Sequence, residues 1–314
     1  MKISEVQEDF MRRSLQLASY GKGFTAPNPL VGAVVVHDGK IIGEGFHRKY
    51  GEAHAEVNAI ASVKDKTILK EATIYVNLEP CSHYGKTPPC AQLIIDKQIP
   101  KVVVGQVDPF PAVSGRGIRM LKEAGVDVVC GVLEKECREL NKRFLTFTQE
   151  QRPYIILKWA QSSDGFIDRI RKVGDGQSPV KFSNPFTQMI VHKLRAEADA
   201  IMIGSHTALL DKPSLDVRFW KGKNPLRLIA RSDKTIREQL NELYNNRIQS
   251  LIVEGGSKLL NSFIKEDLWD EARVEISPVI LNEGVKAPVL NGALQNVQKC
   301  ENSMLFHYKK LPNL

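Results

Sequence analysis

The 314-residue sequence has no apolar run that approaches the length needed to cross a bilayer. Its first nine residues are acidic and lack the apolar region of a secretory signal. It also has no long block of lysine and arginine, and no basic stripe interleaved with aromatic residues of the kind that binds nucleic acid. We therefore expect a cytoplasmic protein that binds neither a membrane nor a nucleic acid.

Cysteine is scarce as well. There are five, namely Cys81, Cys90, Cys130, Cys137 and Cys300. An odd number, with two of them assigned to a metal below, leaves no disulfide framework, and this fits a reducing compartment.

The net charge of +8 is unevenly distributed. Residues 1–150 carry 20 Lys and Arg against 18 Asp and Glu, whereas residues 151–314 carry 24 against 18. A phosphorylated small molecule explains this basic excess as well as RNA would. The length suffices for two domains with separate cores, and the polar segment 149–153, which ends in proline, predicts a boundary between residues 1–150 and 151–314.

Three residues have the chemistry of a zinc site. His54, Cys81 and Cys90 can supply three ligands to a tetrahedral zinc ion and leave the fourth position open to water, as catalytic sites do. Zinc lowers the pKa of such a water to about 7. Glu56 is the expected proton carrier between this water and a leaving amine. Because residues i and i+2 do not share a helix face, His54 and Glu56 can converge only if a helix begins near His54.

The neighbouring segments support this site. The pattern predicts a helix over residues 57–61, a buried strand over 72–78, and a helix over 91–97 that Pro88 and Pro89 help to start. The zinc would then lie between two helix N-termini, whose positive ends favour thiolates. The order His-x-Glu, strand, Pro-Cys and second cysteine is that of zinc-dependent nucleobase deaminases, although those normally have two residues between the cysteines and this chain has eight.

The rest of the first half alternates between helices and strands. Asp38-Gly39 predicts a hairpin turn between two strands. We expect helices over residues 10–20, 117–124 and 133–147, and strands over 31–36, 40–46, 101–105 and 126–129. This pattern predicts an α/β sandwich whose sheet is largely parallel at one end.

Three segments carry a family resemblance: residues 26–33 (Ala-Pro-Asn-Pro-Leu-Val-Gly-Ala), residues 43–47 (Gly-Glu-Gly-Phe-His) and the insert 82–89 between the cysteines. Together they resemble the bifunctional riboflavin-biosynthesis deaminase/reductase, and the likeness covers nearly the whole chain. It implies an N-terminal cytidine-deaminase-like α/β/α sandwich and a C-terminal dihydrofolate-reductase-like α/β domain. It also implies hydrolytic deamination of a diaminopyrimidinone that carries a phosphoribosylamino group, followed by NADPH reduction of the ribosyl side chain to ribityl.

The resemblance assigns binding roles along the chain. The substrate of the first half would be contacted by Asn28, His47, His83 and Lys86. In the second half, the substrate would be contacted by Arg195, Leu215, Arg218 and Glu254, and NADPH by Lys158, Thr207, Asp211, Gly255 and Gly256. The expected assembly has one zinc ion per deaminase domain and is a homo-oligomer joined through the reductase-like domain. Apart from the resemblance, a glycine turn that opens the helix 258–264 offers backbone amides to a phosphate.

The second half departs from the family pattern at three places. Lys181 stands where the family has tryptophan, Ala230 stands where it has aspartate, and the chain passes from Arg231 to the glycine turn without the family's longer strand-and-helix stretch. An active deaminase with a degenerate reductase-like domain is therefore an alternative. A nucleic-acid base deaminase is another, but it gives no reason for the insert or the second domain. A non-catalytic, zinc-stabilised binding protein would not need Glu56, since a fourth protein ligand closes structural zinc sites.

Overall fold

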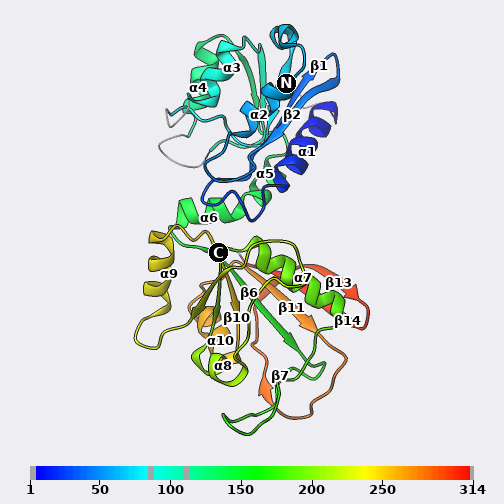
Figure 1. The fold of residues 1–314 in the computed structure, drawn as a ribbon, viewed down its shortest axis with the longest axis vertical. Helices are drawn as coiled ribbons and strands as arrows, with labels where there is room; N and C mark the ends of the chain where they lie inside the picture. Colours follow the sequence, from blue (N-terminus) through cyan, green and yellow to red (C-terminus); the bar gives the residue numbers. More distant parts are fainter. Residues whose placement is uncertain (1–4, 84–87, 109–113, 312–314) are drawn as a thin grey trace. The chain divides into compact units, whose positions relative to one another are not determined.

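The computed structural model describes residues 5–83, 88–108 and 114–311. The chain divides into two compact units, Met1–Glu150 and Gln151–Leu314. Each unit has its own sheet and its own hydrophobic core (Figure 1). Among the described residues, none of the helices is both long enough and apolar enough to span a membrane.

The first unit is built on a five-stranded sheet in the order β2-β1-β3-β4-β5. β1 pairs antiparallel with β2 and β3, whereas β3, β4 and β5 run parallel, as predicted. Asp38 and Gly39 form the hairpin turn with φ values of 47° and 69°, the left-handed conformation that a two-residue hairpin turn favours. The strands are β1 (Gly32–His37), β2 (Lys40–Phe46), β3 (Thr73–Val76), β4 (Lys101–Val104) and β5 (Asp127–Cys130).

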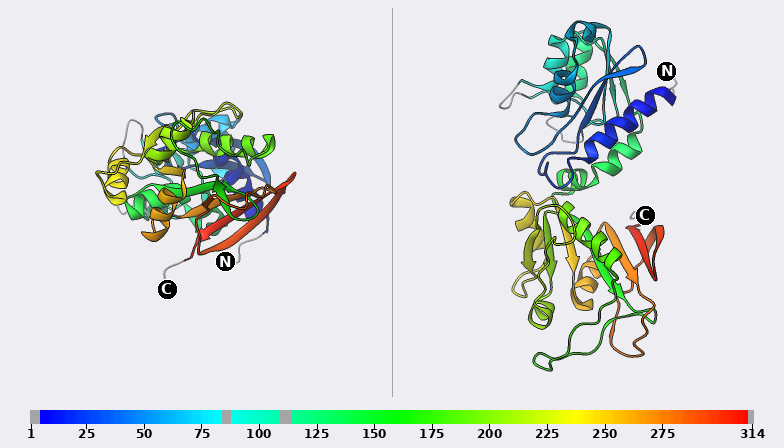
Figure 2. Two further views of the ribbon diagram at one scale, coloured as in Figure 1. Left: turned by 90° about the horizontal axis from the view of Figure 1, so that it is seen from below. Right: turned by 45° about the vertical axis from the view of Figure 1, so that its right-hand side comes forward.

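Helices cover both faces of this sheet (Figures 1 and 2). Successive side chains of a strand point to opposite faces, so each buried strand contributes to two cores. Val76 of β3 packs in the core that contains side chains of α2, α3 and α4, and its neighbour Tyr75 packs in the core of α1 and α5. The helical elements are α1 (Glu5–Ser19), α2 (Ala55–Ser62), the 3-10 helix η1 (Lys66–Glu71), α3 (Cys90–Asp96), α4 (Arg116–Glu123), α5 (Glu134–Leu140) and α6 (Lys142–Glu150). The expected three-layer sandwich is confirmed.

The single helix predicted over residues 133–147 is wrong. The chain forms α5 and α6 instead, and Asn141 separates them with φ −97° and ψ 13°. Its side chain is buried and forms hydrogen bonds with the backbone of Leu30. An asparagine amide that bonds elsewhere in the fold gives the backbone an alternative to the helix, and here it marks the break.

The second unit contains a seven-stranded sheet in the order β13-β14-β11-β6-β10-β8-β9. The strands from β11 to β9 in this order run parallel, and β14 and β13 continue the sheet as an antiparallel hairpin. A separate two-stranded sheet pairs β7 (Phe166–Asp168) with β12 (Val285–Lys286). The large sheet consists of β6 (Tyr154–Gln161), β8 (Ala200–Ile203), β9 (Leu226–Ile229), β10 (Ser250–Glu254), β11 (Glu271–Ile276), β13 (Gly292–Cys300) and β14 (Ser303–Lys310).

Helices also cover both faces of the second sheet. α7 (Pro185–Glu197) and α8 (Ser205–Asp211) pack on one face, and α9 (Ile236–Asn245) and α10 (Ser257–Lys265) pack on the other. Between β9 and β10 the only regular element is α9, so the expected short connection is confirmed. β9 therefore forms an edge of the sheet within the described part of the chain, with Leu226 and Ile229 about half exposed.

Candidate functional sites

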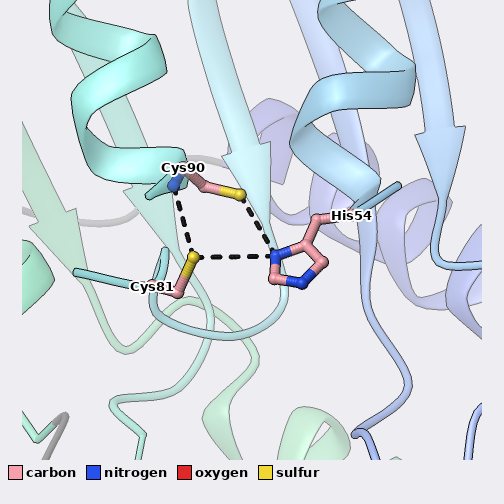
Figure 3. A group of neighbouring side chains, drawn as sticks. All are labelled: His54, Cys81 and Cys90. Atoms are coloured by element: carbon pink, nitrogen blue, oxygen red, sulfur yellow. Dashed lines mark hydrogen bonds between the residues drawn. The ribbon is translucent and has the colours of Figure 1, made fainter. Parts of the chain in front are cut away.

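The three predicted zinc ligands come together in the first unit (Figure 3). His54 is the residue before α2, Cys90 is the first residue of α3, and Cys81 lies in the loop that follows β3. The site thus has a helix N-terminus on two sides, as the sequence predicts. His54 Nδ1 lies 3.6 Å from Cys81 Sγ and 3.3 Å from Cys90 Sγ.

These distances fit a tetrahedral zinc ion. With bonds of about 2.3 Å to sulfur and 2.0 Å to nitrogen, the nitrogen and sulfur ligands of one zinc lie about 3.5 Å apart. The donor set has two soft thiols and one imidazole, which suits zinc, and the three ligand atoms lie within 4.8 Å of one another. The two thiols share a hydrogen bond, which lowers the pKa of Cys81 to about 4 and raises the pKa of Cys90. One thiolate is therefore ready to bind a cation.

Glu56 lies beside these ligands in the first turn of α2 and is only 3% exposed. Its carboxyl group interacts with the Cys90 thiol. Burial raises the pKa of Glu56 to about 7, and the negative charge at Cys81 adds to the effect. A carboxyl group in this environment can take up and release a proton near neutral pH.

Asn28 and His47 lie next to the candidate zinc site. The rings of His47 and His54 meet edge to face, with centroids 5.6 Å apart. His47 Nδ1 is 3.1 Å from the carbonyl oxygen of Ala53, which can only accept, so this nitrogen donates. Burial lowers the pKa of His47 and favours the neutral ring, whose Nε2 then accepts from Asn28 Nδ2 at 3.1 Å. Within the described part of the chain no hydrogen bond reaches Asn28 Oδ1, which can accept from an amino group of a ligand.

His83 and Lys86, the two substrate-binding residues predicted in the insert 82–89, are not equally visible in the structure. His83 is exposed, in the loop after Cys81. Lys86 lies outside the described residues.

Two buried asparagines that the sequence analysis missed hold the segment that carries Asn28. Leu30 N donates to Asn141 Oδ1 at 2.8 Å, and the carbonyl oxygen of Leu30 accepts from the side-chain amides of both Asn141 and Asn77, each at 2.9 Å. Asn77 Oδ1 also accepts from Gly32 N at 2.8 Å. We call Asn77 and Asn141 the asparagine clamp. It fixes the backbone two residues beyond Asn28.

Replacement of Asn141 by alanine is expected to destabilise the first unit by about 1–3 kcal/mol, because Leu30 N–H loses its partner. Urea unfolding followed by circular dichroism would measure the loss. All three tryptophans (Trp159, Trp220 and Trp269) lie in the second unit, so its unfolding can be followed separately by fluorescence and should not change. The matched control is Asn246→Ala, which removes an exposed cap of α9. If the unfolding of the first unit were unchanged in Asn141→Ala, the stabilising role of the asparagine clamp would be contradicted.

Glu79 is a second residue that sequence reasoning missed. It lies two residues before Cys81 and is 4% exposed. Its carboxylate accepts hydrogen bonds from four backbone N–H groups, those of Asp108, Gly115, Gly117 and Ile118. Two of these donors belong to the first turn of α4, where a negative charge is favoured. The loop that carries Cys81 is thereby fixed to the start of α4.

In the second unit, three predicted residues meet where β10 ends beside the middle of the adjacent parallel strand β6. Lys158 of β6 and Glu254 of β10 are register partners. Arg195 of α7 bonds both carboxylate oxygens of Glu254, at 3.2 and 2.8 Å, and both side chains are 12% exposed. Burial would raise the pKa of Glu254, but Lys158 and Arg195 outweigh it and hold the pKa below its ordinary value. The site therefore keeps an ionised carboxylate between two cations.

Arg218 and Leu215 lie in the segment between α8 and β9. Arg218 is exposed and donates to Ser214 and Asp216, at 2.7 and 2.6 Å. The side chain of Leu215 is 6% exposed and packs in the core beside α7. The predicted contact between Leu215 and a ligand would therefore have to come from its backbone, which is held at φ 50°.

Thr207, Gly255 and Gly256 also come together. Gly256 N donates to Thr207 Oγ1 at 3.2 Å, so the turn after β10 lies against the first turn of α8. A β-carbon on Gly256 would lie 3.3 Å from Thr207 Oγ1, and one on Gly255 would lie 3.4 Å from Gly204 N. The turn lies at the start of α10, and a helix N-terminus is where a phosphate group binds favourably. Asp211, the fifth predicted cofactor residue, ends α8 and bonds Arg171.

Comparisons with known proteins identify both units. Residues 4–106 match the family described as "Cytidine and deoxycytidylate deaminase zinc-binding region", and residues 153–241 and 232–307 match "RibD C-terminal domain". The riboflavin biosynthesis protein RibD of Aquifex aeolicus is 37% identical over 359 aligned positions, which cover 99% of this chain and 97% of that protein. The RibD protein of Escherichia coli is 33% identical, with 97% of this chain and 95% of that protein covered.

Solved structures agree. The diaminohydroxyphosphoribosylaminopyrimidine deaminase/5-amino-6-(5-phosphoribosylamino)uracil reductase of Thermotoga maritima is 35% identical, with a TM-score of 0.88 over 98% of this chain and 99% of that one. Acinetobacter baumannii RibD is 29% identical, with a TM-score of 0.87 and the same coverage. The likeness thus extends through both units and includes the zinc-binding region. The chain belongs to the RibD family of riboflavin biosynthesis proteins.

Proposed function

We propose that the chain catalyses two successive reactions on one phosphorylated pyrimidine. The first unit removes an amine by hydrolysis from a diaminopyrimidinone that carries a phosphoribosylamino group. The second unit then reduces the ribosyl side chain to ribityl with NADPH. The observation that carries the proposal is the convergence of His54, Cys81, Cys90 and Glu56 in a chain that matches RibD proteins over both units.

In the first unit, His54, Cys81 and Cys90 would hold a zinc ion, which when bound supplies a water of lowered pKa. Glu56 accepts a proton from the attacking water and donates one to the departing amine. Asn28 presents its carbonyl oxygen toward the ring substituents, held by neutral His47. The exposed His83 and the neighbouring Lys86 are the proposed partners of the phosphate.

In the second unit, the turn at Gly255 and Gly256 together with Thr207, Asp211 and Lys158 would hold NADPH, which supplies the hydride. We call Gly255, Gly256 and Thr207 the cofactor cradle. A β-carbon on either glycine would narrow the space between them, which is consistent with a bound phosphate. Arg195 and Glu254 would bind the substrate along with Arg218 and the backbone of Leu215. Self-association through residues 151–314 stays a prediction.

The short connection between β9 and β10 favours one alternative, an active deaminase joined to a reductase-like domain that no longer works. The alignment with the Aquifex protein has 359 positions and this chain 314 residues, so that protein has segments that this chain lacks. The short connection follows β9 at the edge of the sheet, whereas Lys158 and the glycine turn belong to β6 and to the end of β10, which lie nearer its centre. We therefore favour a working reductase.

One experiment separates the two cases. The full chain, loaded with zinc, is incubated with the diaminopyrimidinone in the presence and absence of NADPH. We expect ammonia release in both samples, and ribityl product with loss of NADPH absorbance only when the cofactor is present. NADPH should be preferred to NADH, because the second unit carries a net charge of +6. Ammonia release without saturable NADPH binding would reassign the second unit as a structural or regulatory partner, and absence of both reactions would overturn the proposed function.

A further inference from the structure

A buried arginine connects three parts of the second unit. Arg171 follows β7, and its side chain is only 3% exposed. Its Nη2 donates to Asp168 Oδ2 at 2.5 Å and to Asp211 Oδ1 at 2.6 Å, and its Nε donates to Asp168 Oδ2 at 2.7 Å. A charge this deeply buried is costly unless it is paired, and here two carboxylates pair it. We call Arg171, Asp168 and Asp211 the arginine bridge.

The bridge closes the segment between β7 and α7. Asp168 uses Oδ2 for Arg171, and its Oδ1 accepts a hydrogen bond from Val180 N at 3.1 Å. One carboxylate therefore fixes both ends of residues 171–180. Lys181, which stands where the family has tryptophan, comes directly after this fixed point. The bridge thus sets where that segment lies relative to the end of α8.

The bridge also orients Asp211. Thr207 and Asp211 are four residues apart in α8, so they share one face of the helix. Thr207 is the residue that accepts from Gly256 N in the proposed cofactor cradle. Arg171 takes Oδ1 of Asp211, and within the described residues no hydrogen bond reaches Oδ2. The Asp211 side chain is 23% exposed, and a carboxylate oxygen such as Oδ2 can accept from a hydroxyl or amide donor of a ligand.

We infer that Arg171 is a positioning residue of the reductase site, which acts by holding the Asp211 carboxylate with one oxygen directed to the cofactor. This inference rests on the proposed function of the second unit. Arg171 Nη2 donates to the carboxylates of both Asp168 and Asp211. Removal of the guanidinium would leave these two negative charges close together with no cation between them. Their repulsion would turn Asp211 away and release the segment that ends at Val180. The cofactor would lose a partner, but the groups that contact the substrate would stay in place.

The test uses the full-length protein with NADPH and the deaminated substrate. Arg171→Met should raise KM for NADPH roughly tenfold or more, while kcat changes far less. This is the loss of affinity expected when one hydrogen bond to a charged group is removed. Arg171→Lys, which keeps the charge, should recover part of the loss. If Arg171 acts through Asp211, the double variant Arg171→Met/Asp211→Asn should have a KM no higher than that of Asp211→Asn alone.

Two controls accompany the series. Arg169→Met removes an exposed arginine two residues away and should leave KM unchanged. Ammonia release by the first unit should be the same in every variant, and tryptophan fluorescence shows whether the second unit is folded. An unchanged KM in a folded Arg171→Met variant would overturn the inference while the proposed function stands. An additive double variant would also overturn it, and failure of the unmodified protein to use NADPH would overturn both.

Discussion

Glu56→Gln is expected to lower the rate of deamination by about 10²–10⁴-fold, the usual value of general acid–base catalysis, with zinc content and fold retained. Glutamine is nearly isosteric but cannot carry a proton. Glu56 is buried beside the Cys90 thiol and has its pKa raised to about 7, so no neighbouring group can simply replace it from solvent. The measurement is ammonia release at saturating substrate, together with metal analysis of the same sample.

Glu52→Gln is the matched control, because it changes an exposed glutamate four residues away. Its turnover should equal that of the unmodified protein. NADPH-dependent reduction of the deaminated substrate should also be unchanged in Glu56→Gln, since that reaction belongs to the second unit. If Glu56→Gln retained near-full turnover, Glu56 would not be the proton carrier.

Cys81→Ser should lose the single equivalent of zinc and, with it, deamination down to background. A serine hydroxyl is a poor replacement for a thiolate, since zinc is bound by deprotonated sulfur. The hydrogen bond that Cys81 Sγ accepts from Cys90 N at 3.2 Å would also change. Metal analysis after purification without chelator measures the first effect, and ammonia release measures the second.

The matched control is Cys130→Ser, which changes an exposed cysteine at the end of β5. It should keep both zinc and activity. Full zinc content in Cys81→Ser would mean that the metal is held elsewhere. Absence of zinc from the unmodified protein would remove the proposed metal centre altogether.

The cluster of candidate zinc ligands was predictable because its residues are set by local pattern. His54 and Cys90 lie where helices begin, and Cys81 lies just after a buried strand, so the order of elements brings the three together. The asparagine clamp was not predictable in this way. Asn141 and Leu30 are 111 residues apart, and no repeat or spacing connects them. The same amide explains why the predicted helix breaks into α5 and α6.

The second unit shows a similar division. The glycine turn before α10 was evident in the sequence because its strand, turn and helix are contiguous. The pairing of Arg195 with Glu254 depends on how α7 packs over β10, and the arginine bridge depends on where residues 169–180 return to the end of α8. Such contacts follow from tertiary packing. Sequence reasoning named Asp211 but not the arginine that holds it.

The asparagine clamp forms its hydrogen bonds with the main chain of Leu30 and not with its side chain. Every residue type except proline has the N–H and C=O groups that Asn77 and Asn141 need, so the side chain at position 30 is free to vary without loss of these bonds. The two asparagines have no such freedom, because few side chains both donate and accept in this geometry. Over evolutionary time, substitutions that retune the neighbouring loop for its ligand can therefore accumulate at position 30, while the backbone that presents Asn28 stays where it is.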